Sequence, residues 1–244
     1  MKSIVLAAGK GKRLMSEQFN LPKVLRRANG KSLLSYVLSK TDFIKPEDTI
    51  IVVGYMKEKV IEEMGSSYIF ATQEQQLGTG HAVASAKDAL TQYDGDVLVL
   101  YGDMPILKKE TYENMIKEHK EKANICTVLT CVTKNPLPYG RIVKNVEGNI
   151  TDIVEDKDCN EEQKKINELN VGVYVFDSKT LFSVLSSLKN NNSQGEYYLT
   201  DAPKLIAALG KQVRPFAIYD ETEIVGVNTL EDLEFVENAL NNGY

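Results

Sequence analysis

The sequence predicts an α/β fold in which a doubly wound, mostly parallel sheet carries an inserted β-hairpin. Short apolar runs alternate with amphipathic segments through the first half of the chain, which is the pattern of βαβ units. A glycine-rich stretch, "LAAGKGKR", follows the first apolar run directly, as expected where a parallel strand passes into a ligand-binding loop. Hydrophobic residues make up 43% of the 244 residues and charged residues 26%, a globular composition that favours one domain.

The first half of the chain supplies the parallel strands and the helices that connect them. Four apolar runs are expected to be strands: Ser3–Ala8, Thr49–Val53, Tyr68–Ala71 and Asp96–Tyr101. Apolar residues at three- and four-residue spacing predict helices over Ser32–Lys40, Lys57–Met64, His81–Leu90 and Glu110–Lys120. Because strands and helices alternate, the crossovers between parallel strands should be right-handed.

The second half of the chain changes character and then returns to the same pattern. Two short segments around a Val-Glu-Gly turn, Arg141–Asn145 and Asn149–Glu155, predict a hairpin on the edge of the sheet. Two further strands are expected over Asn170–Phe176 and Val213–Ile218. Three further helices are expected over Thr180–Leu188, Thr200–Leu209 and Leu230–Leu240.

The composition excludes several classes of partner. A net charge of −5 argues against nucleic acid, whose phosphate backbone binds basic surfaces. The first residues lack the length and cleavage site of a signal peptide, and no apolar run is long enough to span a bilayer, so we expect no membrane partner. Three cysteines, an odd set without metal-ligand spacing, indicate free thiols in a reducing compartment, and we therefore expect a cytoplasmic protein.

Histidine and cysteine chemistry is not expected in this chain. His81 and His119 are the only histidines and lie in unrelated patterns, so neither a His-based metal site nor a Ser-His-Asp relay can be assembled. Cys126 and Cys131 are five residues apart within a strand-like run, which places them on opposite faces of the sheet. We expect both to pack in the core.

The first candidate site is the loop after the first strand. Gly9 and Gly11 allow main-chain N–H groups to approach a phosphate, and Arg13 and Lys23 supply positive charge in an otherwise acidic chain. The loop lacks the third glycine of a dinucleotide fingerprint, and the chain has no GxxxxGK[ST] motif. The glycines by themselves therefore leave a second interpretation open, a tight strand-to-helix connection with solvated lysines nearby.

Two polar residues follow or end apolar runs. Asp103, in "YGDMP", follows a fully apolar strand, so its carboxylate should reach the same edge of the sheet, where it can hold Mg²⁺. Asn228, in "GVN", ends another short apolar run and could add an amide oxygen to the same ion. Taken singly, Asp-x-Pro also forms turns readily, and the segment at Asn228 also suits a helix N-cap region.

Two further motifs combine glycines with polar side chains. "QLGTGHAV" places two glycines and a threonine before a helix, which suits contacts between the main chain and a base or phosphate. Alternatively, Thr79 caps that helix. "QGEYYLTD" presents Tyr197, Tyr198 and Thr200 after a polar loop, and the two tyrosines are alternatively aromatic residues of the core.

These motifs occur together in a known order. The series "LAAGKGKR", "LPKVL", "QLGTGHAV", "YGDMP", "YGRIV", "IVEDKD", "LNVGVYVF", "QGEYYLTD" and "GVN" is that of the sugar-nucleotide pyrophosphorylase family, and it spans nearly the whole chain. "GTGHA" and "QGEYY" point to one branch of that family. The chain therefore resembles the uridylyltransferase domain of the bacterial N-acetylglucosamine-1-phosphate uridylyltransferases. The resemblance implies a Rossmann-like, GT-A-like nucleotidyltransferase fold.

The resemblance also implies roles for individual residues. It assigns the uridine nucleotide to Leu6, Ala7, Ala8, Gly9, Gln73, Gly78 and Thr79. It assigns the sugar-phosphate pocket to Gly140, Glu155, Asn170, Tyr198 and Thr200, with Tyr101 and Gly102 bordering both ligands. It makes Arg13 and Lys23 the catalytic residues at the reacting phosphates, and Asp103 and Asn228 the ligands of Mg²⁺.

The implied reaction joins UTP and N-acetylglucosamine-1-phosphate to give UDP-N-acetylglucosamine, a precursor of cell-wall peptidoglycan, and pyrophosphate. These small molecules are the expected partners, and the oligomeric state is left open. Glucose-1-phosphate and N-acetylgalactosamine-1-phosphate are alternative substrates, because a pocket separates such close analogues by few contacts. A catalytically silent nucleotide-sugar sensor is the alternative outside enzymes.

The chain departs from the family in the first loop and at its end. Lys12 stands where threonine is common, and the loop Gly9–Pro22 is longer than in similar members; both touch the expected triphosphate site. Bifunctional members continue into a left-handed β-helix that performs acetyl transfer, whereas this chain reaches Tyr244 near the connecting helix. We expect a nucleotidyltransferase domain over residues 1–228, a C-terminal helix over 229–244, and neither a β-helix nor acetyltransferase activity.

Overall fold

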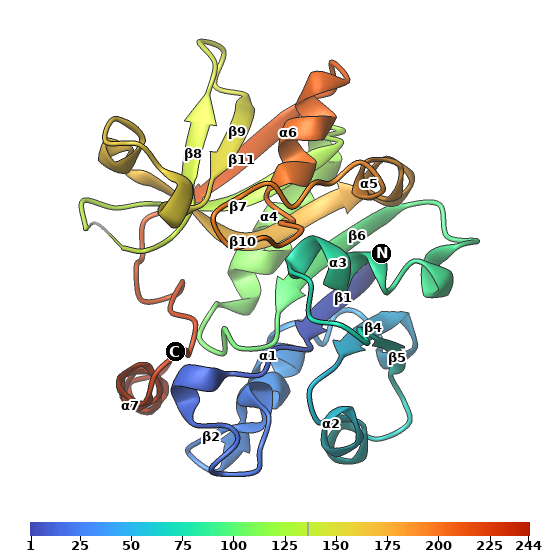
Figure 1. Cartoon of the computed structure of the whole chain (residues 1–244), viewed down its shortest axis with the longest axis vertical. Helices are drawn as coiled ribbons and strands as arrows, with labels where there is room; N and C mark the ends of the chain where they lie inside the picture. The colour runs from blue at the N-terminus through green and yellow to red at the C-terminus, as the bar shows by residue number, and fades with distance from the viewer. Residues whose placement is uncertain (136) are drawn as a thin grey trace.

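The computed structural model describes residues 1–135 and 137–244, with Lys12 as main chain only, and is built around one large sheet (Figure 1). The strands along this sheet, in spatial order, are β11 (Val213–Ile218), β7 (Cys126–Val132), β10 (Glu168–Asp177), β6 (Asp96–Tyr101), β1 (Lys2–Ala7), β4 (Thr49–Val53) and β5 (Ile69–Thr72). Neighbouring strands on this path are parallel except where β10 runs antiparallel to β6 and β7. The predicted mostly parallel sheet is confirmed.

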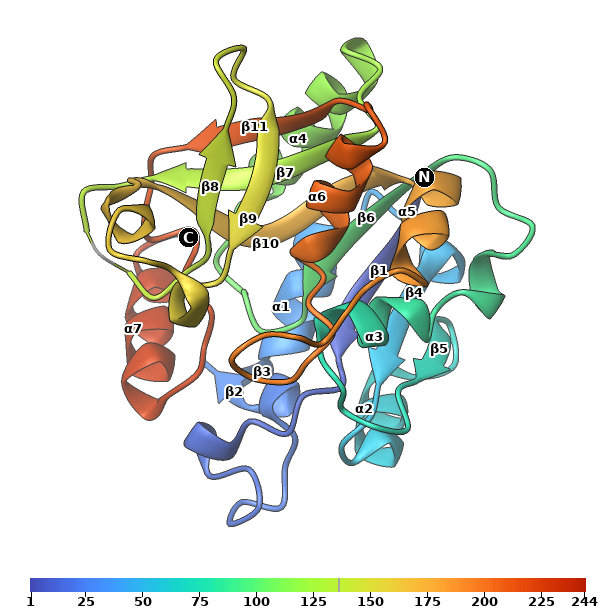
Figure 2. The ribbon, with the colours of Figure 1, turned by 45° about the horizontal axis from the view of Figure 1, so that its top comes forward.

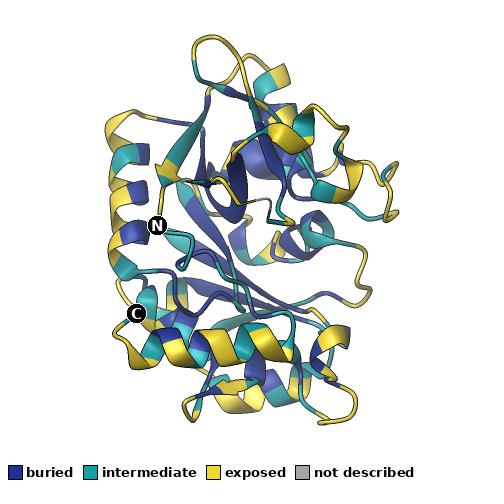
Figure 3. Cartoon of the chain, turned by 90° about the vertical axis from the view of Figure 1, so that its left-hand side faces the viewer, coloured by how far each residue is buried: buried dark blue, intermediate teal, exposed yellow. Residues whose placement is uncertain are grey.

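Helices cover both faces of this sheet. They are α1 (Leu33–Lys40), α2 (Lys57–Met64), α3 (Thr79–Ala84), α4 (Lys109–Glu121), α5 (Ser178–Leu185), α6 (Asp201–Ala208) and α7 (Leu230–Asn241). Apolar side chains of α1, α2 and α4 join one buried cluster with Val5 and Ala7 of β1, whereas those of α3, α5 and α6 join another with Ile4 and Leu6. Successive side chains of β1 thus anchor opposite faces of the sheet. Figure 3 shows the buried strands between helices whose outer faces are exposed.

The predicted hairpin is present, but it does not lie on the outer edge of the sheet. It consists of β8 (Arg141–Lys144) and β9 (Ile150–Val154), and β8 pairs with the inner strand β10 at Leu169. β10 is ten residues long, whereas β6 pairs only with its last part, Tyr174–Asp177. The first part of β10 therefore extends past β6, and the hairpin rises from it (Figure 2).

A third apolar cluster joins parts of the chain that are distant in sequence. Its buried members are Leu14, Ala28, Leu33, Ile106, Val227, Val236 and Ala239. A small second sheet, β2 (Arg27–Ala28) with β3 (Lys31–Ser32), lies beside α7 (Figures 1 and 2). The amide of Asn29 ties the two together by donating to the main-chain oxygen of Glu237 at 3.2 Å. Because Leu14 and Val227 both belong to the third apolar cluster, the segments that contain them lie together.

The predicted helix over His81–Leu90 differs most from the structure. In place of a helix over His81–Leu90, α3 ends at Ala84. The hydroxyl of Ser85 donates to the carbonyl of His81 at 3.0 Å, and Ala86 N bonds three residues back, to Val83. The hydroxyl of Ser85 thus shares the His81 carbonyl with the Ser85 N–H, and the three-residue bond of Ala86 departs from the α-helical pattern. The short 3₁₀ helices are Lys12–Leu14, Lys23–Leu25, Pro46–Asp48, Asp88–Leu90, Asp156–Asp158 and Gln163–Lys165.

The core agrees with the expectations for the cysteines. Cys126 and Cys131 are buried in the two clusters on opposite faces of the sheet. Within the described residues, none of the helices combines the length and the apolar composition needed to cross a membrane.

The buried His119 makes stability depend on pH. Its Nδ1 lies 2.8 Å from Thr127 Oγ1 and its Nε2 lies 3.4 Å from Asp96 Oδ1. Burial lowers the pKa of His119 below 6.5, although Asp96 opposes this shift. Below the unfolded-state pKa the unfolded chain takes up a proton that the folded chain resists, so stability falls as the pH falls.

We therefore expect His119→Gln to be less stable than the wild type at neutral pH, with a difference that narrows on acidification because the variant lacks this titration. Urea unfolding of both proteins between about pH 7.5 and about pH 5.5 measures the difference. A difference that stays constant over this range would contradict the assignment.

Candidate active site

A cleft of about 800 Å³ opens at the carboxyl ends of β1 and β6. Ligands bind at this edge of open α/β sheets because strand ends and loops leave a crevice there. The residues predicted from the sequence that line it are Leu6, Ala8, Gly9, Lys23, Gln73, Gly78, Thr79, Tyr101, Asp103, Gly140, Glu155, Asn170 and Asn228. The cleft therefore gathers residues from segments spread over most of the chain.

At one end of the cleft, the ammonium of Lys23 lies between Asp103 and Asn228. Its Nζ forms an ion pair with the Asp103 carboxylate and donates a hydrogen bond to Asn228 Oδ1 at 2.8 Å. The side chains of Lys23 and Asp103 are only 14% and 17% exposed, so this pair is weakly screened by solvent. One cationic group thus marks the place where both predicted metal-binding oxygens point.

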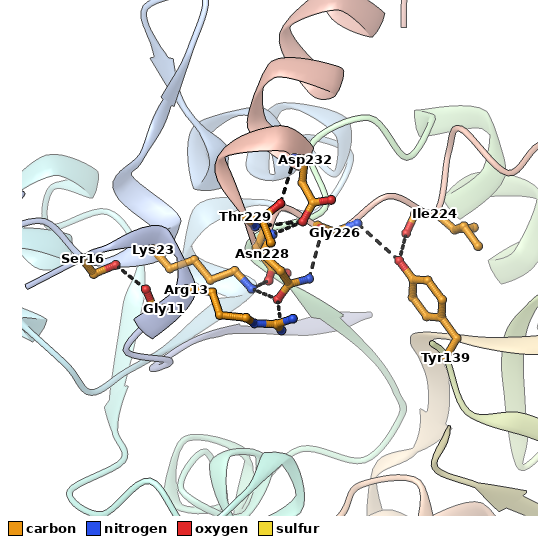
Figure 4. Close-up of polar contacts among 11 residues, drawn as sticks. Gly11, Arg13, Ser16, Lys23, Tyr139, Ile224, Gly226, Asn228, Thr229 and Asp232 are labelled. Carbon is orange, nitrogen blue, oxygen red and sulfur yellow. Dashed lines mark hydrogen bonds and ion pairs between the residues drawn. The ribbon is translucent and has the colours of Figure 1, made fainter. Parts of the chain in front are cut away.

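The orientation of the Asn228 amide is fixed. Its Nδ2 donates to the carbonyl of Gly226 at 3.0 Å, so its Oδ1 must point toward Lys23. The guanidinium of Arg13 donates to the same Oδ1 at 3.3 Å (Figure 4). Arg13 is exposed at the rim rather than in the lining of the cleft, yet it meets Lys23 at a common acceptor.

The loop that carries Arg13 packs closely on Lys23. Gly11 has a φ of +66°, and a Cβ there would lie 2.6 Å from the Cβ of Lys23. Ser16 closes the loop by donating its hydroxyl to the carbonyl of Gly11 at 3.0 Å. Gly11 is therefore required by the loop itself, whereas a Cβ at Gly9 would meet open space and only Gly9 lines the cleft.

The wall formed by residues 73–79 is held by its own polar contacts. The amide of the buried Gln73 donates to the carbonyl of Gly78 at 3.0 Å, and its Nε2 lies 3.1 Å from His81 Nδ1. Thr79 does not cap α3: its Oγ1 accepts a hydrogen bond from the main chain of Leu199 at 3.0 Å. The capping interpretation of Thr79 is therefore wrong.

The opposite part of the cleft contains Glu155 and Asn170. Burial raises the pKa of Glu155, and the hydroxyl of Thr200, which donates to it at 2.9 Å, opposes the shift. Asn170 is oriented by donating to Tyr174 Oη at 2.8 Å and accepting from Gly172 N at 3.2 Å. An acceptor carboxylate and an amide thus face a half of the cleft that carries no lysine or arginine in its lining.

Five predicted residues do not line the cleft. Ala7 is packed in the core, and Gly102 lies against Leu34 and donates its N–H to the carbonyl of Leu6. Thr200 lies behind Glu155, and Tyr198 is only 6% exposed, with its hydroxyl accepting from Gln194 at 2.9 Å. Arg13, as described, is at the rim. In this structure Tyr198 is a core aromatic residue, the alternative left open from the sequence.

The sequence motifs did not identify two lining residues that shape the site. Gly172 has a φ of +89°, and a Cβ there would overlap the ring of Tyr101. A glycine inside an apolar strand, in "LNVGVYVF", was the available signal for such a close approach. Tyr139 donates its hydroxyl to the carbonyl of Ile224 at 2.7 Å and gave no signal of its own, because this contact depends on residues 85 positions apart.

The residues present fit a divalent cation. Among the residues with described side chains, no three His, Cys, Asp or Glu groups gather as a metal site. The two oxygens predicted to bind a metal ion, the Asp103 carboxylate and the Asn228 amide oxygen, are both in contact with the ammonium of Lys23. Mg²⁺ is commonly held by one or two carboxylates, with waters and substrate phosphates completing its octahedral shell.

Comparisons with known proteins agree with this architecture. The model of the nucleotidyl transferase family matches residues 2–217. The bifunctional protein GlmU of Streptococcus thermophilus is 40% identical over 238 residues, which cover 98% of this chain and 51% of that protein. GlmU of Acetivibrio thermocellus is 41% identical over 228 residues, covering 93% and 49%. The chain spans about half the length of the curated relatives it matches.

Solved structures show the same fold at lower identity. The crystal structure of a UDP-glucose pyrophosphorylase complexed with UDP-glucose has a TM-score of 0.77 and 20% identity, and the match covers 100% of this chain and 99% of that one. The apo form of a UDP-glucose pyrophosphorylase has a TM-score of 0.73 at 20% identity, with coverage of 99% and 98%. At these identities the likeness concerns the fold.

The packing of Gly172 on Tyr101 can be tested with a matched glycine. Gly172→Ala should lower the free energy of unfolding by about 1–2 kcal/mol because an alanine is strained at a positive φ. Overlap of the new Cβ with the Tyr101 ring should lower it by about 1–3 kcal/mol more. Gly148 has a φ of +80° and open space around it, so Gly148→Ala should lose only the first part. Denaturant unfolding compares the two, and equal losses would show that Tyr101 does not constrain residue 172.

Proposed function

The chain belongs to the nucleotidyl transferase family, and we propose that it transfers the uridylyl group of UTP to N-acetylglucosamine-1-phosphate. The products are UDP-N-acetylglucosamine and pyrophosphate. The observation that carries this proposal is the meeting of Lys23, Asp103 and Asn228 at one end of the cleft, with Arg13 at its rim. The 40% identity to bifunctional GlmU over 98% of the chain supports the choice of substrates.

The reaction requires no general base. The phosphate of a sugar-1-phosphate has a second pKa of about 6, so most of it is a dianion at neutral pH. One of its oxygens attacks the α-phosphorus of UTP, the bond from that phosphorus to the bridging oxygen breaks, and the electron pair leaves with pyrophosphate. Such transfers depend on alignment and on neutralisation of charge. This agrees with a described cleft lining that contains no histidine.

Basic side chains provide much of that neutralisation. Lys23 and Arg13 share the single acceptor Oδ1 of Asn228, and both are long enough to transfer their hydrogen bonds to phosphate oxygens. Lys10, which also lines the cleft, forms an ion pair with Glu17 and lies 5.5 Å from the centre of the Tyr55 ring. These contacts support our assignment of the triphosphate to this end, beside the loop after β1.

Asp103 and Asn228 would hold the metal ion, which we propose to be Mg²⁺. When bound, Mg²⁺ supplies positive charge that draws the two phosphoryl groups together and stabilises the charge of the transition state. Asp103 contributes the carboxylate and Asn228 the neutral oxygen, while Lys23 is positioned to turn from both toward the phosphates.

The remaining lining residues are assigned to the two organic groups. Gln73, Gly78 and Thr79 would contact the uridine side, and Gly140, Glu155 and Asn170 the sugar, with Tyr101 between them. Burial and the carboxylates of Glu155 and Asp103 hold the pKa of Tyr101 well above its ordinary value, so its phenol remains protonated. We also propose that residues 1–228 form the catalytic domain, that 229–244 form its C-terminal helix, and that the protein acts in the cytoplasm.

The test is to incubate the protein with Mg²⁺, the common nucleoside triphosphates and a panel of sugar-1-phosphates, and to follow pyrophosphate release. UTP with N-acetylglucosamine-1-phosphate should be the fastest pair. A faster reaction with glucose-1-phosphate or N-acetylgalactosamine-1-phosphate would overturn the sugar assignment. Nucleotide binding without turnover of any pair would instead indicate a sensor.

Arg13→Ala should lower turnover by about 100-fold, the usual effect of removing one donor to developing negative charge. The loss should appear mainly in kcat, because Arg13 lies at the rim and contributes little to the shape of the cleft. Arg27→Ala is the matched control: Arg27 pairs with Glu63 and does not line the cleft, so its loss should leave kcat unchanged. Unaltered turnover in the Arg13 variant would refute its role.

Removal of divalent cations should abolish turnover, and Mg²⁺ should restore it. Asp103→Asn keeps an oxygen but loses the charge, so half-maximal turnover should need at least about tenfold more Mg²⁺. Asp152→Asn, which removes a carboxylate paired with Lys204 outside the cleft, should show the wild-type requirement. Equal Mg²⁺ requirements for the two variants would contradict the metal site.

A further inference from the structure

We propose that Asp232 is a positioning residue for the cation-binding pair, because its carboxylate sets the main chain of Asn228 so that the Asn228 amide oxygen faces Asp103. This inference rests on the proposed function, since it concerns the same site. Asp232 belongs to the first turn of α7 and does not line the cleft. It therefore acts through Asn228 and does not touch the reacting atoms.

The carboxylate of Asp232 makes two main-chain contacts through one oxygen. Its Oδ2 accepts hydrogen bonds from Asn228 N at 2.8 Å and from Thr229 N at 2.9 Å. In return, Asp232 N donates to Thr229 Oγ1 at 3.1 Å, which completes a capping box. The two halves of the capping box act on different residues. The Thr229 hydroxyl accepts from an N–H of the helix, whereas the Asp232 carboxylate also accepts from Asn228 N, which belongs to the residue before the N-cap.

The other donors around Asn228 have partners of their own, so its main-chain N–H is the donor that Asp232 satisfies. Val227 is fully buried and its N–H donates to the carbonyl of Asp103 at 3.0 Å. The Asn228 side chain uses its Nδ2 on the carbonyl of Gly226. Figure 4 shows Asp232 above this segment, with Lys23 and Arg13 on the other side of it, at the amide oxygen. With both sides held, the direction of Oδ1 is set before any ligand arrives.

The charge of Asp232 contributes in addition to its hydrogen bonds. The N-terminus of a helix carries partial positive charge from its unpaired N–H groups, which disfavours a cation nearby. Asn228 directly precedes the N-cap Thr229 of α7, so a divalent ion on Asn228 would lie close to this positive end. The carboxylate of Asp232 accepts from the N–H of the N-cap Thr229 and from that of Asn228 just before it, and its negative charge offsets the partial positive charge of the helix end. A cation can then be held beside a helix end that would otherwise repel it.

The experiment uses Mn²⁺ as a probe of the metal site and measures free Mn²⁺ by electron paramagnetic resonance in the presence of saturating UDP-N-acetylglucosamine. Loss of an outer partner of a metal ligand typically weakens metal binding by roughly 10-fold or more. Asp232→Ala should therefore weaken Mn²⁺ binding about tenfold. Asp232→Glu, which restores the usual carboxylate of a capping box, should recover most of the affinity.

Two control variants separate positioning from helix capping. Thr229→Ala removes the half of the capping box that serves the helix but leaves the Asp232 carboxylate on Asn228 N. Asp177→Ala removes the N-cap residue of α5, which lies at the opposite end of the sheet. The Asp177 carboxylate accepts a hydrogen bond from Thr180 N at 2.8 Å. Both should lower the melting temperature while keeping wild-type affinity for Mn²⁺.

The outcomes decide between the possibilities. Wild-type Mn²⁺ affinity in Asp232→Ala, or an equal loss in Thr229→Ala, overturns the inference. If Asp232→Ala does not fold, Asp232→Asn replaces it, and a smaller loss in the same direction supports the inference while unchanged affinity overturns it. Absence of Mn²⁺ binding and of pyrophosphate release in the wild type would overturn the proposed function itself.

Discussion

The contact of Lys23 with both Asp103 and Asn228 is the interaction on which the proposed site depends. It joins a loop that follows the first strand, the end of a central strand and a segment near the C-terminal helix, so it forms only when three parts of the fold meet. The ammonium of Lys23 attracts both oxygens, and because the side chains of Lys23 and Asp103 are largely buried, solvent screens this attraction little. The same contact keeps both oxygens directed at a position that a metal ion can occupy.

Apolar packing next to the site holds these parts of the chain together. Leu14, directly after Arg13, and Val227, directly before Asn228, are fully buried in one cluster with Val236 of α7. Residues 13 and 228 thus meet because their neighbours share a small core, which removes much of the entropy cost of ordering the loop at the site. Asp232 then adjusts the last detail, the direction of the Asn228 main chain.

The second half of the cleft is tied to the first by Tyr139. Its hydroxyl donates to the carbonyl of Ile224, and burial raises its pKa to about 12, so the phenol stays a donor at physiological pH. Tyr139 precedes Gly140, which lies in the half of the cleft that we propose for the sugar, while Ile224 leads to Asn228 in the half that we propose for the phosphates. One hydrogen bond therefore joins the two halves of the cleft directly. The antiparallel strand β10 makes a second contact across the cleft, because Gly172 has no side chain and the ring of Tyr101 packs against its main chain.

The sequence by itself determined the order of most strands and helices along the chain, the placement of Cys126 and Cys131 on opposite faces of the sheet, and the place of the candidate site. These follow from local periodicity, from the polar residues that end apolar runs, and from the resemblance of the motifs to a known family. Asp103 and Asn228 were identified in this way, and both line the cleft. Tertiary structure alone decided the antiparallel direction of β10, the attachment of the hairpin to an inner strand and the withdrawal of Tyr198 and Thr200 from the lining. It also decided the contacts of Lys23, Tyr139 and Asp232, because each depends on the three-dimensional distance and orientation of main-chain groups, which the spacing of residue types does not encode.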